Sequence, residues 1–321
     1  MKRLTVALLL AVSILTTGCA VANPHEDKEL SYREAGIAAI EKGDYDGAVT
    51  NLQKSLDASN GRISDVELDV CYYKGYALLK AGKTDEAKKV YNAIINYDEE
   101  ATGAYVQRGN LYALTKQYAK ADKDYKKALE LDQNNFQIYI SAYENLMAGG
   151  AEEELAKSYL NQALTRRAQT GEEYRNMGRV YLLLGDYENA RKIFSKAENE
   201  GDEESKLYMG QVLESMGNKE EAYALYESYA MAHKDNKKAF MKLIESLLKQ
   251  KDYEQVKQYI KKAKNSLKGD DKKEIMELEI KLCEEEGELS EAMNLLKTYT
   301  AKYPSDEKAA KELKFLQSRV K

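Results

Sequence analysis

Small and bulky apolar residues return along the chain at an interval of about 35 residues, each time within a helical pattern of apolar and polar positions. The clearest marker is a small residue, usually alanine, that stands shortly after a turn-like stretch. It is found at Ala48, Ala87, Ala121, Ala156, Ala190, Ala222, Val256 and Ala292. A fixed period of this length predicts an architecture built from one repeated supersecondary unit.

Glycines recur at two fixed places in the period. One set lies twelve residues before the marker, at Gly36, Gly75, Gly109, Gly178 and Gly210. A glycine inside a helix costs about 1 kcal/mol relative to alanine, so five at one phase indicate close helix crossings. The other set, with Gly43 and Gly185 as examples, predicts left-handed helix ends. Each period therefore predicts two antiparallel helices that must pack on the next pair to bury their apolar face.

The third and fifth periods resemble the tetratricopeptide repeat (TPR). The matching residues are Tyr105, Gly109, Tyr112, Tyr118, Ala121, Tyr125, Ala128 and Leu129, and then Tyr174, Gly178, Tyr181, Gly185, Tyr187, Ala190, Phe194 and Ala197. The resemblance implies an all-α fold, an α-solenoid of about eight TPR-like helix pairs that forms a right-handed superhelix. We place the repeats near 29–62, 68–101, 102–135, 136–170, 171–202, 203–236, 237–270 and 273–306, with a C-terminal capping helix over 307–321. Length alone favours about two domains, but the repeat predicts one solenoid over 29–306.

The start of the chain has the pattern of an export signal. Two cations precede an apolar run from Leu4 to Leu15, and Gly18 and Cys19 follow it. The run is shorter than the roughly 20 residues that span a bilayer, so it predicts a signal peptide over 1–18. The pattern resembles the lipobox of bacterial lipoproteins, which implies cleavage before Cys19 and lipid attachment to that cysteine. Thr16 stands where the lipobox favours leucine, and plain secretion is the alternative.

Charge limits the partners of the exported chain. Removing Lys2 and Arg3 with the signal leaves 47 of the 49 basic residues against 54 acidic ones, a net charge of −7. Such a protein gains nothing from a nucleic-acid backbone or an anionic lipid surface. We therefore expect no nucleic-acid partner, and attachment to the membrane through lipid and a short tether over 19–28. The expected location is the outer face of a bacterial cytoplasmic membrane, or an outer membrane.

The composition offers little catalytic or cofactor chemistry. The two histidines, His25 and His233, lack neighbours at metal-ligand spacing, so we expect no metal site and no enzyme. Residues 77–84 fit a loose phosphate-loop pattern, but they end a helix and follow no strand, so we expect no nucleotide or other cofactor. Cys71 and Cys283 stand far apart in apolar helical patterns, which favours two free thiols.

The TPR resemblance places the partner-binding residues on the first helix of each pair. In that family the second, fifth, ninth and twelfth positions of this helix line a concave groove. Carried over, they include Tyr72, Tyr76, Asn110, Glu144, Arg175, Arg179, Gln211 and Glu214. Tyrosine and arginine are frequent anchors at interfaces, and the pairs Tyr72/Tyr76 and Arg175/Arg179 each project from one helical face. Packing between repeats is the alternative for the tyrosines, since tyrosine is the general filler of this chain.

These features together predict a lipid-anchored TPR scaffold that binds a protein or peptide in its groove and serves cell-envelope assembly. A lipoprotein that binds a small ligand, glycan or peptidoglycan is the alternative. The chain has no tryptophan, the residue that often stacks on sugars, although tyrosine can replace it. The set with which some TPR proteins hold a C-terminal carboxylate is not reproduced, because Ile37 stands where its asparagine would fall.

Overall fold

The computed structural model describes residues 24–304 and 306–319. The expected signal peptide, Cys19 and the start of the tether lie outside these residues.

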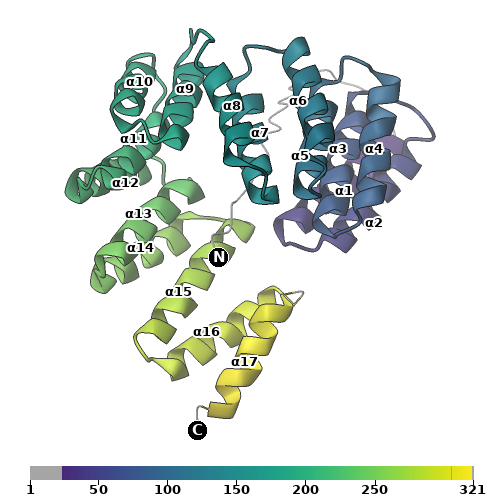
Figure 1. The fold of residues 1–321 in the computed structure, drawn as a ribbon. Coiled ribbons are helices and arrows are strands. Elements are labelled where there is room, and N and C mark those ends of the chain that lie inside the picture. Colours follow the sequence, from purple (N-terminus) through teal and green to yellow (C-terminus); the bar gives the residue numbers. More distant parts are fainter. Residues whose placement is uncertain (1–23, 305, 320–321) are drawn as a thin grey trace. The chain divides into compact units, whose positions relative to one another are not determined.

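Helices make up almost the whole of the described ranges, which contain no strand (Figure 1). In chain order they are α1 (Pro24–Glu41), α2 (Tyr45–Ala58), α3 (Asp65–Lys80), α4 (Thr84–Tyr97), α5 (Thr102–Leu114), α6 (Tyr118–Leu131), α7 (Phe136–Gly149), α8 (Glu153–Ala163), α9 (Gly171–Leu184), α10 (Tyr187–Asn199), α11 (Ser205–Ser215), α12 (Lys219–Ala232), α13 (Lys237–Gln250), α14 (Tyr253–Ser266), a 3-10 turn (Gly269–Lys272), α15 (Lys273–Glu285), α16 (Leu289–Lys302) and α17 (Glu307–Arg319). Helices α1 to α16 form consecutive contacting pairs, and α17 packs on α16. The predicted all-α fold of TPR-like pairs with a terminal helix is confirmed.

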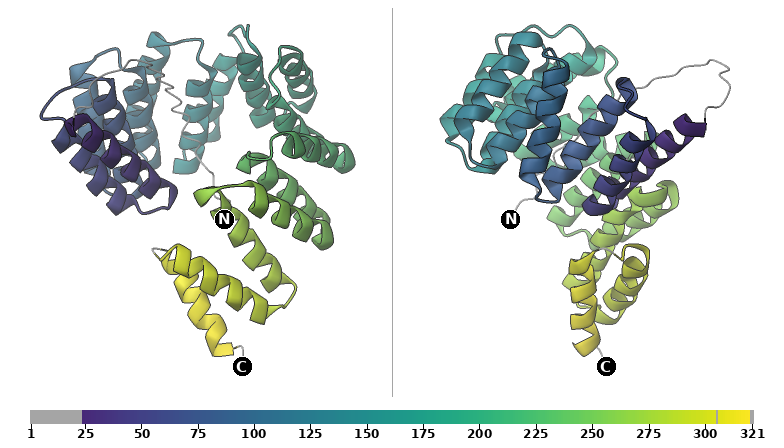
Figure 2. Two further views of the ribbon diagram at one scale, coloured as in Figure 1. Left: turned by 180° about the vertical axis from the view of Figure 1, so that it is seen from behind. Right: turned by 90° about the vertical axis from the view of Figure 1, so that its right-hand side faces the viewer.

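The chain divides into two compact units at residue 167. Unit 1 contains α1 to α8 and unit 2 contains α9 to α17, and residues 164–170 between α8 and α9 form no helix. Within each unit, successive pairs lie side by side (Figure 2). We describe each unit by itself.

A glycine of the first helix faces a ring of the second helix in four pairs. The facing residues are Gly75 and Tyr91, Gly109 and Tyr125, Gly178 and Phe194, and Gly210 and Tyr226. A Cβ atom added to any of these glycines would lie within 2.8 Å of the ring. The rings are fully buried, so the helices can approach only because the glycines lack a side chain. This is the close crossing that the sequence predicts.

The turn within a pair uses a residue in the left-handed region. Gly185 has a φ of 79° and ends α9, and the side chain of Asp186 then accepts the Asn189 N–H at the start of α10. In two pairs a lysine takes the place of the glycine, with φ values of 61° at Lys116 and 59° at Lys251. A non-glycine residue is strained there, so these turns depend on the packing on either side.

Two details extend the sequence-based view. Helix α1 begins at Pro24, inside the expected tether, which agrees with the preference of proline for the first turn of a helix. Cys71 and Cys283 are free thiols, as predicted. None of the described helices combines the length and the apolar character needed to cross a membrane.

Candidate partner-binding site

The predicted partner contacts lie on the first helices of the pairs. In unit 1 these are α3, α5 and α7, where α5 contacts both of the others. In unit 2 they are α9 and α11, which contact each other, and the next first helix, α13, is joined to α11 by the ion pair of Lys249 with Glu214. We call the surface that these helices form in each unit its first-helix face.

Tyr72 and Tyr76 lie one turn apart on α3, and both are half-buried. The Tyr72 hydroxyl oxygen would lie 3.2 Å from a Cβ atom at Gly103, at the start of α5 in the next pair. Burial raises the pKa of each tyrosine to about 12. Tyr72 therefore packs between two pairs, which was the alternative for this residue. The ring of Tyr76 lies under Lys80, whose Nζ is 5.5 Å from the ring centroid.

Asn110 lies inside unit 1, where only 5 % of its surface is exposed. Its Oδ1 accepts hydrogen bonds from the Tyr125 hydroxyl at 2.8 Å and from Ser141 Oγ at 3.1 Å. Asn110 was predicted to line an open groove, and its burial does not agree with that prediction. Its side-chain amide instead links α5 to α6 and α7 inside the unit. Glu144 is half-buried on α7.

The arginine pair of α9 is engaged by its own unit. The side chain of Arg175 is 13 % exposed and forms ion pairs with Asp202 and, at 3.0 Å, with Glu204. The guanidinium carbon of Arg179 lies 5.4 Å from the centroid of the Tyr208 ring. Burial raises the pKa of Asp202, although the charge of Arg175 opposes this shift. Arg175 thus neutralises internal carboxylates.

Lysines from the next pair complete this network, and the sequence-based reasoning did not find them. Lys238 donates hydrogen bonds to Glu204 and, at 2.8 Å, to the Tyr208 hydroxyl. Burial by itself would raise the pKa of Glu204. The hydrogen bond and the charge of Lys238 outweigh burial and lower this pKa below its usual value. Lys249 pairs with Glu214 at 2.7 Å. The two lysine–glutamate separations along the chain, 34 and 35 residues, equal one repeat, and that spacing was the available signal.

Gln211 completes the set of predicted groove residues. Its side-chain amide donates to the Leu207 carbonyl at 3.4 Å on its own helix, α11. It is half-buried. Like Arg175 and Glu214, it is held by contacts within unit 2.

Two apolar side chains on the first-helix face of unit 1 were also missed. Leu114 ends α5 and is 39 % exposed, and Met147 stands near the end of α7 and is 37 % exposed. The same ends of the two helices touch, because a Cβ atom at Gly149 would lie 2.1 Å from the Ala113 carbonyl oxygen. Exposed large apolar residues at one place are typical of a binding surface.

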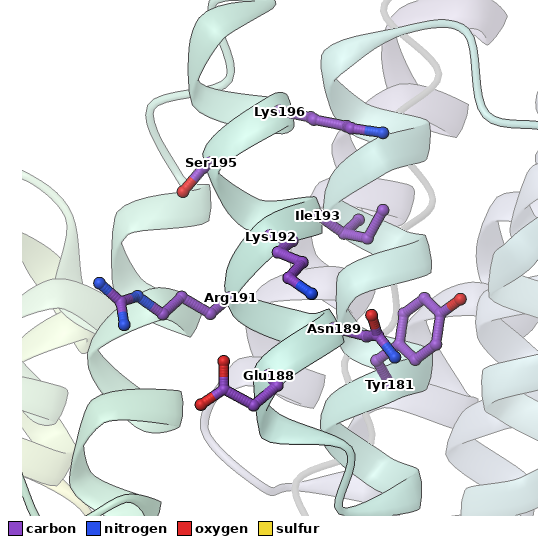
Figure 3. A pocket seen from close by; sticks show the side chains of 8 residues that line it. All are labelled: Tyr181, Glu188, Asn189, Arg191, Lys192, Ile193, Ser195 and Lys196. Carbon is purple, nitrogen blue, oxygen red and sulfur yellow. The ribbon is translucent and has the colours of Figure 1, made fainter.

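A separate recess of about 580 Å³ lies mainly on α10, the second helix of its pair (Figure 3). It is lined by Tyr181 of α9 and by Glu188, Asn189, Arg191, Lys192, Ile193, Ser195 and Lys196 of α10. Neither unit, in its described residues, contains a group of histidine, cysteine or acidic side chains that could hold a metal ion.

Three segments of the chain match the tetratricopeptide repeat family, over residues 69–99, 103–135 and 174–199. They coincide with the pairs α3–α4, α5–α6 and α9–α10. These three segments are tetratricopeptide repeats. A stack of TPR pairs is a scaffold suited to protein–protein contacts.

Known proteins share parts of this TPR array. Neutrophil cytosol factor 2 of Homo sapiens is 36 % identical over 102 residues, which are 31 % of this chain and 18 % of that protein. TPR repeat-containing protein YpiA of Bacillus subtilis (strain 168) is 21 % identical over 197 residues, 61 % of this chain and 45 % of that protein. The chain therefore spans less than half the length of either relative. The crystal structure of yeast Tom70 superposes with a TM-score of 0.59 at 16 % identity, covering 82 % of this chain and 55 % of that one, which shows the shared fold.

Proposed function

We propose that this protein is a lipid-anchored, extracytoplasmic TPR scaffold that binds a protein or peptide partner and serves assembly of the bacterial cell envelope. The observation that carries the binding role is the first-helix face of unit 1. There Leu114 and Met147 expose apolar surface at the touching ends of α5 and α7. A partner that covers these side chains gains the free energy of their removal from water.

The partner contact is better supported in unit 1 than at the arginines of unit 2. Arg175 is already neutralised by Asp202 and Glu204, so a partner would have to compete with internal ion pairs. Leu114 and Met147 have no such competition, and their exposed parts contact water in the unbound unit. We therefore propose Leu114, Met147 and the half-buried Tyr76 as the anchoring residues on this face.

Recovery of partners from cells tests the binding role. The variant with Leu114→Gln and Met147→Gln should lose the partner in a pull-down, with its helical circular dichroism unchanged. The matched control is Ile63→Gln, since Ile63 is an apolar residue of the same unit that is 55 % exposed before α3. Recovery of every partner by the double variant would contradict the proposed face.

The lipid anchor is a separate part of the proposal and rests on the lipobox-like sequence that ends at Cys19. A lipid-modified cysteine would keep the chain with the membrane fraction. Cys19→Ser, or treatment of cells with globomycin, should change the processing of the chain and release it from that fraction. Unchanged processing and fractionation would refute the anchor and leave the binding face untouched.

A further inference from the structure

The outer face of α10 differs in charge balance from the first-helix face. The α10 recess is lined by the cations Arg191, Lys192 and Lys196 and by one carboxylate, that of Glu188. Within the described ranges, the side chains of these three cations form no ion pair or hydrogen bond, and Lys196 Nζ lies 6.0 Å from the centroid of the Tyr174 ring. On α13, by contrast, Lys238 is held by Glu204 and Lys249 by Glu214. Unit 2 thus leaves a local excess of positive charge on α10.

Part of the recess is lined by apolar side chains. Figure 3 shows Tyr181, Ile193 and Lys196 on one side of α10, Arg191 on the other, and Lys192 between them. Tyr181 and Ile193 are half-buried, whereas the lysines are exposed. A bound segment could therefore place an aliphatic side chain against Tyr181 and Ile193 and carboxylates against the lysines.

The support beneath this face is rigid. Phe194 points inward from α10, is buried against Gly178, and stacks on Tyr208 with ring centroids 5.7 Å apart. The start of α10 is capped by Asp186. The lysine stems therefore project from a helix whose position is set by packing, so little backbone order is lost when a partner binds.

We propose that the outer face of α10 is a docking surface for a short acidic segment of a protein partner. The charge of the whole chain selects this occupant over a long polyanion. The chain has 49 basic and 54 acidic residues, so without the three α10 cations the balance is 46 against 54, or −8. A nucleic acid or an anionic bilayer would extend into this negative surrounding field, whereas a short segment meets only the cations within about 8–10 Å.

The inference rests on the protein-binding role proposed above but places a second contact on a different surface. The two contacts can be tested separately, because α10 belongs to unit 2 and Leu114 and Met147 belong to unit 1.

Fluorescence anisotropy with the full-length protein, purified as cells process it, tests the docking surface. The probe is a short fluorescein-labelled peptide of alternating glutamate and leucine. We expect saturable binding that the double variant Lys192→Glu with Lys196→Glu weakens about tenfold or more. The control, Lys261→Glu with Lys262→Glu, makes the same charge change on exposed positions of α14 and should change the affinity less than twofold.

Three results would overturn the proposal. They are a wild-type protein that does not bind the peptide, equal weakening by the α10 and α14 variants, and no weakening by the α10 variant. A single-stranded oligothymidylate that binds with the same dependence on Lys192 and Lys196 would also overturn it, in favour of a phosphate polymer. The Leu114→Gln, Met147→Gln variant should bind the peptide like wild type, so failure of the first-helix face and failure of the α10 face are distinguishable.

Discussion

Buried tyrosine hydroxyls provide a sharp test of the packing within a pair. Tyr91 and Tyr125 occupy equivalent positions on α4 and α6 of unit 1, each across from a helix glycine. The Tyr125 hydroxyl donates a hydrogen bond of 2.8 Å to Asn110 Oδ1. The Tyr91 hydroxyl is buried and has no hydrogen-bond partner among the described residues. Tyr125→Phe therefore removes a buried hydroxyl group that is hydrogen-bonded, and Tyr91→Phe removes one that is not.

The two changes should shift the stability of unit 1 in opposite directions. Loss of a buried hydrogen bond costs about 1 kcal/mol, so Tyr125→Phe should lower the free energy of unfolding by that amount. Removal of an unpaired buried hydroxyl relieves a desolvation cost of about 1–3 kcal/mol, so Tyr91→Phe should raise it. Phenylalanine is compatible with this slot, since Phe194 fills it in the pair α9–α10. The two variants should differ by about 2 kcal/mol or more.

Urea unfolding followed by circular dichroism measures both variants on one scale. For a unit of this size, 1 kcal/mol corresponds to about 2–4 °C in melting temperature, so thermal melts provide a second readout. Tyr226→Phe, in unit 2, is an independent replicate because the Tyr226 hydroxyl also lacks a partner within the described part of the chain. Equal destabilisation by Tyr91→Phe and Tyr125→Phe would contradict an unpaired Tyr91 hydroxyl.

Three further predictions concern a crossing, an acid and an ion pair, each measured by urea unfolding. Gly178→Ala puts a Cβ atom 2.6 Å from the Phe194 ring, so it should cost about 1–3 kcal/mol, and adding Phe194→Leu should restore part of this loss; no restoration would argue against the crossing. The second prediction concerns Glu67. Burial by itself would raise the pKa of this carboxyl group, but hydrogen bonds, led by the one from Ser64, lower it from 4.5 to about 2. The Glu67 contribution is therefore present above pH 4.5 and is lost as the pH falls towards 2, and Glu67→Gln should flatten this part of the stability–pH curve; an unchanged slope would contradict the shift. Arg175→Met should cost about 2–4 kcal/mol by leaving Asp202 without its cation and Glu204 with Lys238 alone, whereas Lys249→Met, at a site 65 % exposed, should cost less than about 1 kcal/mol; equal costs would refute the difference in burial.

The helix pairs were predictable because their determinants are local and repeat along the chain. A glycine such as Gly75 and an aromatic residue such as Tyr91 recur at a fixed spacing in the sequence. That spacing indicates where the two helices of a pair cross. The turns at Lys116 and Lys251 contain a lysine in place of the glycine and still fall at the same point of the repeat. The start of α1 at Pro24 was not found, since no repeat position marks it.

The candidate site was less predictable because exposure depends on side chains that come from the next pair. The position of Arg175 in its helix predicted a cation that lines the groove. In the structure this side chain forms ion pairs with Asp202 and Glu204. Asn110 has a groove position in the sequence and an internal one in the structure, where Ser141 of α7 reaches it. Leu114 resembles any core leucine of a first helix, and only the packing of the pairs leaves it exposed.

The central claim is that a protein partner is bound on the first-helix face of unit 1. Site-specific photo-crosslinking in intact cells tests it most directly, with p-benzoylphenylalanine placed at position 114 in one strain and at position 63 in another. We expect a discrete crosslinked partner from position 114, identifiable by mass spectrometry, and none of that partner from position 63. No adduct from position 114, or the same adducts from both positions, would contradict it.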